Sequence, residues 1–159
     1  MPEKIFYHGS PNALPPGFLL KGRNDEFWNN LQATNAYFWL EKFRPQGMIA
    51  HKDAIFMCDN LEDIDVCGGS TKWLFKLEPL SRVERHDMNW GSAISAYLDE
   101  IQDSQDLDVD YIKKLAENYW NGIPHTDENL WEYLCEHVKI ISVEALDVDL
   151  EDKSSMHQS

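Results

Sequence analysis

Residues 4–10 read KIFYHGS, an aromatic and β-branched run that ends at a glycine. Such residues are enriched in strands and glycine often ends them, so the run predicts a β-strand over Lys4–His8. Residues 10–22 contain three prolines and two glycines, which predicts a loop. His8 is therefore expected at a strand end, projecting toward whatever this loop covers, with Gly9 allowing close approach of a ligand to the backbone.

Other runs of strand character lie further along the chain. The apolar run AIFMC at Ala54–Cys58 is bounded by acidic and amide residues and predicts a buried strand. In Thr71–Leu77, the residues Trp73, Phe75 and Leu77 alternate with their neighbours, which predicts a strand with one well-buried face. The sequence predicts two more strand-like segments, the aromatic Ala36–Leu40 and the Ile/Val-rich Lys139–Leu146.

Helical patterns concentrate in the second half. Apolar residues recur at three- and four-residue steps from Val109 to Tyr119, and Gly122 and Pro124 follow as stop signals, so this segment predicts a helix. Thr126 is expected to cap a second helix, with Asp127 and Glu128 in its first turn and its inner side formed by Leu130, Trp131 and Leu134. Weaker signals predict helices over residues 24–32 and 93–101, and a turn over 61–66 capped by Asn60.

Strands therefore gather toward both ends of the chain, with helices between them and no regular strand–helix alternation. This order predicts the α+β class, with the first and last strands in one sheet. The length of 159 residues suits one domain. We expect it to occupy residues 1–147, followed by a flexible acidic and polar tail at 148–159.

Composition indicates the cellular location of the protein and the redox state of its cysteines. The chain has no run of about 18 apolar residues and no signal-peptide pattern at its start, so we expect a soluble cytoplasmic protein without a membrane partner. The cysteines, Cys58, Cys67 and Cys135, are widely spaced and form no CxxC pair, which predicts reduced thiols.

The net charge of −14 is distributed unevenly. Residues 1–92 carry 12 acidic against 10 basic side chains, whereas residues 93–159 carry 16 against 4. A surface with this field repels phosphate backbones, so direct binding of a nucleic-acid backbone is not expected. The acidic half could instead imitate nucleic acid.

Several common chemistries have no motif here. The sequence contains no HExxH or CxxC pair, and Gly68-Gly69-Ser70 lacks the Lys-Ser/Thr of a P-loop. A GxSxG nucleophile elbow is also absent, which argues against an α/β-hydrolase. No metal site is expected.

The run Tyr7-His8-Gly9-Ser10 resembles the first motif of the diphtheria-toxin-like ADP-ribosyltransferases, including the small bacterial rifampin-modifying type. The strand Ala54–Cys58 with the following DNLED is similar to the second motif, and Thr71–Pro79 resembles the next core strand. Glu132, ahead of the late strand, resembles the carboxylate of the third motif, although here it is expected on a helix. The resemblance implies a split antiparallel β-sheet core with peripheral helices.

The same resemblance implies an enzyme that transfers ADP-ribose from NAD, the co-substrate, to a protein or small-molecule acceptor. Glu132 and His8 take the catalytic positions, Glu132 by stabilising the cationic ribose and His8 by binding the adenosine ribose. Tyr7, Gly9 and Ser10 belong to the NAD-binding motif, with the Gly9 backbone holding the carboxamide.

An aromatic side chain is expected to stack on the nicotinamide ring. Either Phe56 or Tyr37 could do so, and the sequence leaves this open; Phe56 stands where the family has a hydroxyl-bearing residue. Arg44 and Lys52, in the less acidic half, are the expected partners of the pyrophosphate.

The alternative is a non-enzymatic acidic binding protein, such as a phage-type anti-defence inhibitor that mimics nucleic acid. Its carboxylates would lie along Asp99–Asp110 and Asp127–Glu136. This hypothesis predicts strongly salt-dependent association with a basic partner and no dependence on His8.

Overall fold

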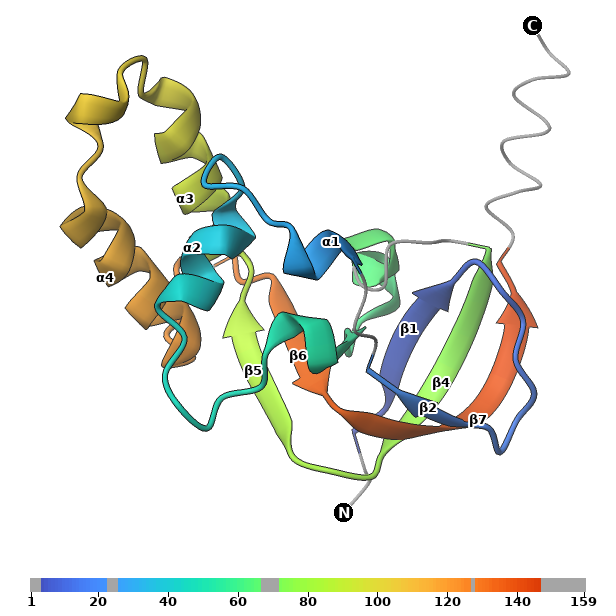
Figure 1. Cartoon of the computed structure of the whole chain (residues 1–159). Helices are drawn as coiled ribbons and strands as arrows, with labels where there is room; N and C mark the ends of the chain where they lie inside the picture. Colours follow the sequence, from blue (N-terminus) through green and yellow to red (C-terminus); the bar gives the residue numbers. More distant parts are fainter. Residues whose placement is uncertain (1–3, 23–25, 67–71, 127, 147–159) are drawn as a thin grey trace, which may run out of the picture.

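The computed structural model describes residues 4–22, 26–66, 72–126 and 128–146. They form two antiparallel sheets with helices beside one of them, which confirms the α+β class (Figure 1). The four-stranded sheet has the order β1 (Phe6–Ser10), β4 (Trp73–Pro79), β7 (His137–Ala145) and β2 (Leu19–Lys21). The three-stranded sheet has the order β3 (Ile55–Met57), β6 (Trp131–Cys135) and β5 (Val83–Asp87). The first and last strands share a sheet as predicted, with β4 between them.

The helices lie mainly on the side of the three-stranded sheet (Figure 1). Helices α3 (Asn89–Glu100) and α4 (Val109–Trp120) form a hairpin whose tip projects from the body, and α2 (Ala36–Lys42) packs against both. The remaining helical segments are short: α1 (Glu26–Asn29) and the 3₁₀ turns η1 (His51–Asp53), η2 (Leu61–Val66) and η3 (Ser104–Asp106). The predicted turn over 61–66 and its cap are confirmed, because Asn60 accepts the Glu62 amide at 3.1 Å.

One backbone bridge joins the two sheets. The Tyr7 amide donates to the Cys58 carbonyl at 2.8 Å, and the Cys58 amide donates to the Tyr7 carbonyl at 3.0 Å. Continuing this antiparallel ladder would pair Gly9 with Phe56. The Phe56 carbonyl instead accepts from His8 Nδ1 at 2.7 Å. The His8 ring thus occupies the position where the two sheets separate, which we call the seam.

Two apolar cores flank the three-stranded sheet. The first lies between the two sheets and includes Phe6, Met57, Phe75 and Tyr133. The second lies between the three-stranded sheet and the helices and includes Leu40, Ile112, Trp120 and Leu134. Because β6 is buried on both faces, its alternate residues enter different cores.

Helix α4 confirms the strongest helical prediction. Asp108 caps its start by accepting the Tyr111 amide at 3.2 Å. Gly122 ends it at φ +71°, with amide bonds from Gly122 to the Tyr119 carbonyl and from Ile123 to the Asn118 carbonyl, both at 3.1 Å. These two bonds form a Schellman motif, in which glycine accepts the left-handed backbone at little cost.

The prediction of a strand at Ala36–Leu40 is wrong. The segment is the start of α2, because Asn35 caps it by accepting the Tyr37 amide at 2.8 Å. Ala36, Trp39 and Leu40 then form a buried helical stripe.

The helix predicted after Thr126 is also wrong. Thr126 accepts the Glu128 amide at 3.1 Å in a tight turn, and residues 131–135 form β6. Glu132 therefore lies on a strand. Strand β2 falls inside the segment predicted as a loop, and strand β5 was not predicted. The predicted helix over 24–32 narrows to Glu26–Asn29 among the described residues.

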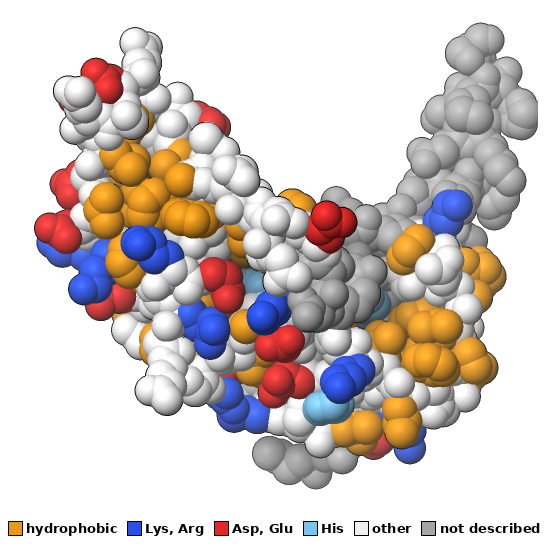
Figure 2. All heavy atoms as spheres, in the orientation of Figure 1, with side chains coloured by type: hydrophobic (Ala, Val, Ile, Leu, Met, Phe, Trp, Pro, Cys, Tyr) orange, Lys and Arg blue, Asp and Glu red, His pale blue; other side chains and the backbone are white. Residues whose placement is uncertain are grey.

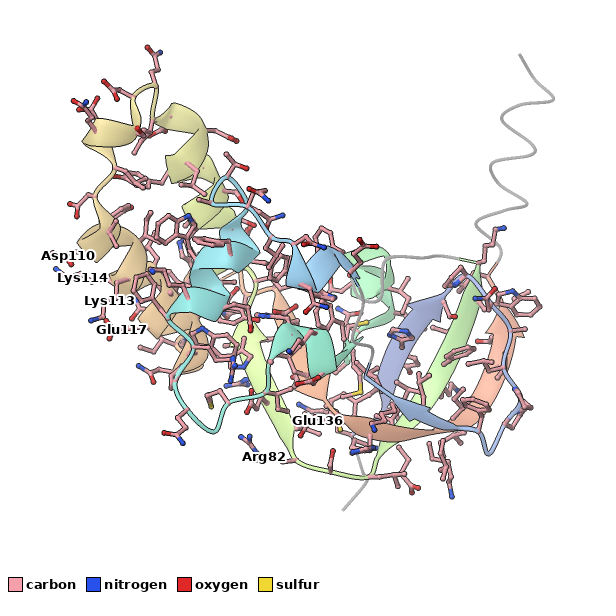
Figure 3. The ribbon with its side chains drawn as sticks, viewed as in Figure 1. Arg82, Asp110, Lys113, Lys114, Glu117 and Glu136 are labelled. Atoms are coloured by element: carbon pink, nitrogen blue, oxygen red, sulfur yellow. The ribbon has the colours of Figure 1, made fainter. Side chains whose placement is uncertain are left out.

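The acidic side chains gather on the α3–α4 hairpin. The acids from Asp99 to Asp110 are exposed around its tip. Along α4, the labelled Asp110, Lys113, Lys114 and Glu117 point away from the body (Figure 3). The space-filling view also shows apolar side chains grouped on this hairpin and on the outer part of the four-stranded sheet (Figure 2). Asp127, Cys67 and the tail at 148–159 lie outside the described residues.

Candidate functional site

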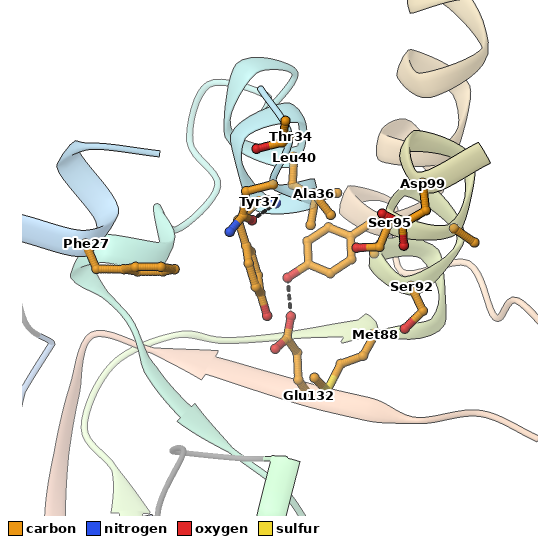
Figure 4. A pocket seen from close by; sticks show the side chains of 14 residues that line it. Phe27, Thr34, Ala36, Tyr37, Leu40, Met88, Ser92, Ser95, Asp99 and Glu132 are labelled. Atoms are coloured by element: carbon orange, nitrogen blue, oxygen red, sulfur yellow. Dashed lines mark hydrogen bonds between the residues drawn. The ribbon is translucent and has the colours of Figure 1, made fainter. Parts of the chain in front are cut away.

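A cleft of about 660 Å³ opens between α2, α3 and strand β6. Glu132 and Tyr37 lie on its walls, and Figure 4 shows the Tyr37 side chain directed toward the Glu132 carboxylate. Most of the other polar lining comes from the start of α2 and from α3: Thr34, Asn35, Ser92, Ser95 and Asp99. No Lys or Arg is among the described residues that line this cleft.

The Glu132 carboxylate is the most unusual group in the cleft. The residue is 1% exposed, and its Oε2 accepts a hydrogen bond from the Tyr119 hydroxyl. Its Oε1 is buried and has no hydrogen-bond partner. Leaving a buried polar atom unpaired costs about 1–3 kcal/mol, and more for a charged group. Glu132 Oε1 is therefore the one oxygen of this carboxylate that still lacks a donor.

A chain of hydrogen bonds runs from Glu132 to the edge of the molecule. The Tyr119 hydroxyl also contacts His51 Nε2 at 2.7 Å, and His51 Nδ1 contacts Glu41 Oε2 at 2.6 Å. His51 is fully buried, whereas the Glu41 side chain is one-quarter exposed. We call these four residues, Glu41, His51, Tyr119 and Glu132, the relay.

The electrostatic surroundings of Tyr119 and Glu41 shift the pKa of each group. Burial, followed by the negative charge of Glu132, raises the pKa of Tyr119 well above its usual value, so its hydroxyl remains a donor. Burial would raise the pKa of Glu41, but the hydrogen bonds and charge of His51, together with Arg44, lower it below its ordinary value. Glu41 therefore stays ionised at neutral pH.

The chain segment that leads into β6 and Glu132 is held by Asp87, a fully buried residue at the end of β5. Its carboxylate accepts the amides of His125 at 2.9 Å and Leu130 at 3.3 Å. These bonds hold both ends of the loop that precedes β6. The register places His86 of β5 directly opposite Glu132, so the strand pairing and this loop together position the carboxylate.

The seam supplies a second binding feature. Antiparallel strands alternate the direction of their backbone groups, so Gly9 directs its N–H and C=O to the same side as Tyr7, away from β4. The described backbone bonds outside the regular ladders include none to Gly9. A carboxamide could therefore pair with this N–H and C=O.

Aromatic rings connect the seam to the relay. The Phe56 carbonyl binds His8, and the Phe56 ring lies 5.8 Å from the His51 ring. Trp28 stacks on His51 with ring centroids 5.5 Å apart, and Tyr37 meets the same imidazole edge-on at 4.9 Å. The structure thus brings His8, Phe56, Tyr37 and Glu132 into one continuous set of contacts. Of the predicted site residues, only Tyr37 and Glu132 line the cleft, and His8, Gly9 and Phe56 do not.

Other predicted site residues have different surroundings. Arg44 donates to Glu41 at 3.2 Å and to the Met48 carbonyl at 2.8 Å. Lys52 is exposed on η1, and neither cation lines the cleft. The Tyr7 side chain packs beside Cys58 and Leu74, and the Ser10 hydroxyl forms a local turn with Asn12.

Sequence reasoning missed His51 and Glu41 altogether and assigned Tyr119 only to an apolar helix face. Tyr119 does lie on the predicted inner stripe of α4, but its hydroxyl is a polar atom directed into the core. No local pattern marks His51, because its role depends on partners 10 and 68 residues away.

Within the described residues, no helix has the length and apolar composition that crossing a membrane requires. The same residues contain no group of three or more His, Cys, Asp or Glu side chains placed to hold a metal ion. No protein-family model matches this chain, and no similar sequence is found among curated proteins.

Proposed function

We propose that this protein is an NAD-dependent ADP-ribosyltransferase in which Glu132 is the catalytic carboxylate. The observation that carries the proposal is the Glu132 Oε1 atom, which is buried on the wall of a cleft without a hydrogen-bond partner. A ribose hydroxyl of NAD would complete its hydrogen bonding. The same carboxylate would stabilise the positive charge that develops on the ribose in the transition state.

The reaction breaks the bond between the ribose carbon and the nicotinamide nitrogen. Nicotinamide leaves with the electron pair, a nucleophilic atom of the acceptor bonds to the same ribose carbon, and the acceptor loses a proton. In this proposal Gly9 holds the carboxamide through its backbone, and His8 contacts the adenosine ribose. Tyr37 is the better candidate for stacking on nicotinamide, because it lines the cleft and Phe56 does not.

The architecture supports this proposal. Two antiparallel sheets that meet in one bridge are what a split β-sheet core requires, and the separation begins at His8 of the motif Tyr7–Ser10. Glu132 also lies at the start of a late strand, as the resemblance to the third motif implies. For the pyrophosphate, exposed Lys52 is a better candidate than Arg44, whose guanidinium already has two partners.

Release of nicotinamide from NAD by wild-type protein and by Glu132→Gln tests the proposal. We expect the variant to lose about 10²-fold or more in turnover, because an uncharged amide stabilises a cationic ribose poorly. Glu136→Gln, at an exposed position directly after the same strand, is the matched control and should keep wild-type turnover. Equal turnover in Glu132→Gln would refute the catalytic role of Glu132. Calorimetry that shows no NAD binding would refute the proposal of an NAD-dependent enzyme.

The acidic hairpin favours the second candidate, a binding protein for a basic partner. Its acids from Asp99 to Asp110 are exposed, but the stretch Asp127–Glu136 contributes less, because Glu132 is buried. Changing Asp103, Asp106, Asp108 and Asp110 to Asn removes four of the six negative charges of the tip while keeping side chains that can cap helices. Salt-dependent binding of polylysine that survives these changes would exclude this role for the hairpin.

A further inference from the structure

The relay connects four elements that are distant in sequence. Glu41 belongs to α2, His51 to η1, Tyr119 to α4 and Glu132 to β6. Its three hydrogen bonds are continuous, and its inner three residues are each no more than 1% exposed. Buried polar networks are costly unless every member is satisfied. Here the only unsatisfied atom of the relay is Glu132 Oε1, at its cleft end.

The partners define the positions of the protons. Glu41 accepts from His51 Nδ1, so that nitrogen carries a proton. When Tyr119 donates to Glu132, its oxygen must accept from His51 Nε2, and His51 is then an imidazolium. A second arrangement uses the same bonds. One proton moves from His51 Nε2 to the Tyr119 oxygen while the Tyr119 proton moves to Glu132 Oε2, leaving His51 and Glu132 both neutral.

We propose that His51 is a positioning residue that controls the protonation of Glu132 through the Tyr119 hydroxyl. In the resting protein His51 is charged, pairs with Glu41 and directs the Tyr119 proton to Glu132, which stays a carboxylate although it is buried. The relay also lets Glu132 exchange one proton with His51 through the Tyr119 hydroxyl. Its importance for catalysis rests on the function proposed above, whereas its effect on Glu132 does not.

Other ionisable groups lie beside the relay and also affect the charge near Glu132. Tyr37 and Asp99 share the cleft with Glu132, and Arg44 contacts Glu41. On β5, His86 lies opposite Glu132 and stacks on the Tyr119 ring at 4.5 Å. Both of its ring nitrogens face acceptors, the Tyr119 carbonyl at 2.7 Å and Glu84 at 3.2 Å. Both ring nitrogens of His86 are thus engaged, and among the described hydrogen bonds none connects His86 to the Glu132 carboxylate.

Two variants interrupt the relay at different points. Tyr119→Phe removes the donor to Glu132 and keeps the ring in its packed position. His51→Gln preserves hydrogen-bonding capacity but cannot carry the extra proton. Tyr133→Phe is the matched control, because Tyr133 lies next to Glu132 on β6 yet directs its hydroxyl to Asp59 at 2.9 Å and Lys4 at 3.1 Å in the other core.

The first readout is infrared absorption of carboxyl groups at pH 7.5, which requires no NAD. We expect a band from a protonated buried carboxyl in Tyr119→Phe and His51→Gln, because a buried carboxylate without its donor takes up a proton. The band should be absent from wild-type protein and Tyr133→Phe. It should disappear when Glu132→Gln is added to Tyr119→Phe, which assigns it to Glu132.

The second readout is the pH profile of nicotinamide release. Turnover at pH 7.5 should fall roughly tenfold or more in both relay variants and recover as the pH rises and Glu132 ionises. Nitrogen NMR of the His51 ring should show both nitrogens protonated in wild-type protein. Thermal unfolding identifies any variant that fails to fold. If His51→Gln fails to fold, Tyr119→Phe, which loses a single hydroxyl, tests the proposal alone.

The two proposals can fail separately. If wild-type protein releases no nicotinamide but the infrared band appears in both variants, the proposed enzyme fails and the relay stands. If the folded variants show no protonated Glu132 and keep the wild-type pH profile, the relay is wrong even if the protein is an active transferase.

Discussion

The Glu84 carboxylate shows how this core accommodates charge. It is 5% exposed on β5, yet both of its oxygens have donors. The Ile49 amide reaches them at 3.0 and 3.1 Å, Arg82 at 2.6 Å and His86 at 3.2 Å. A buried charge with this many partners holds the segment before η1 against β5, and it also supports the imidazole beside Glu132.

Removing the Glu84 carboxylate should lower the stability of the fold much more than removing its exposed partner, Arg82. We expect Glu84→Ala to lower the free energy of unfolding by roughly 3–5 kcal/mol, because it leaves the Ile49 amide and the His86 ring without their buried acceptor. Arg82→Ala should cost less than about 1 kcal/mol, since the Arg82 side chain is 57% exposed. Urea denaturation measures both. Glu78→Ala, in the exposed pair with Lys139, is the control, and equal losses in all three would contradict this account.

At the scale of single elements, two helix glycines behave differently. Gly122 ends α4 at φ +71°, where an added Cβ would lie 3.3 Å from the Arg85 carbonyl. Gly91 lies inside α3, and its Cβ would meet only Leu40 Cδ1 at an ordinary 3.7 Å. The left-handed backbone requires glycine at the first position, and nothing in the backbone requires it at the second.

The same substitution should therefore change stability in opposite directions. We expect Gly122→Ala to destabilise the protein by about 1–2 kcal/mol. Gly91→Ala should stabilise it by roughly 0.5–1 kcal/mol, because alanine loses less backbone entropy in a helix. Thermal unfolding of the two variants in parallel is the measurement. An unchanged or increased stability of Gly122→Ala would contradict the role given to Gly122 at the end of α4.

The elements that the sequence predicts correctly have simple local signals. The apolar run of β3 and the alternation in β4 are visible without tertiary information, as is the stripe of α4. Strand β5 reads VERHD and escapes detection because its buried residues are Glu84, His86 and Asp87. Their burial depends on partners elsewhere in the chain, which no hydrophobic pattern reports.

The two wrong assignments have a different cause. Ala36–Leu40 is aromatic enough for a strand, and only the cap at Asn35 and the spacing of Ala36, Trp39 and Leu40 indicate a helix. Trp131–Cys135 has polar and apolar residues buried on both faces, so its alternation is hidden. In both segments tertiary packing decides between two locally acceptable structures.

At the scale of the whole molecule, the site depends on how the two sheets and the helices meet. A resemblance in short motifs named His8 and Glu132 as residues of one site, but it could not give the aromatic contacts between them. Those contacts arise because β3 has one edge on the seam and carries Phe56 toward the helices. Of the eleven described acidic residues between 93 and 146, seven lie on the projecting hairpin.

The single bridge of the seam also has a chemical consequence. Cys58 is fully buried at that bridge, whereas Cys135 is fully buried within β6, between β3 and β5. Separation of the two sheets would break two backbone bonds at Cys58 and would also open the core between the sheets, to which Cys135 belongs. In a Cys67→Ser background, we expect a thiol reagent to label Cys58 and Cys135 at similar rates in native buffer, as followed by mass spectrometry, because parting of the sheets exposes both. Labelling of Cys58 well before Cys135 would mean that the bridge opens locally while the core between the sheets stays closed. A slower reaction at Cys58 with NAD present would give a direct measure of how far a ligand holds the two halves together.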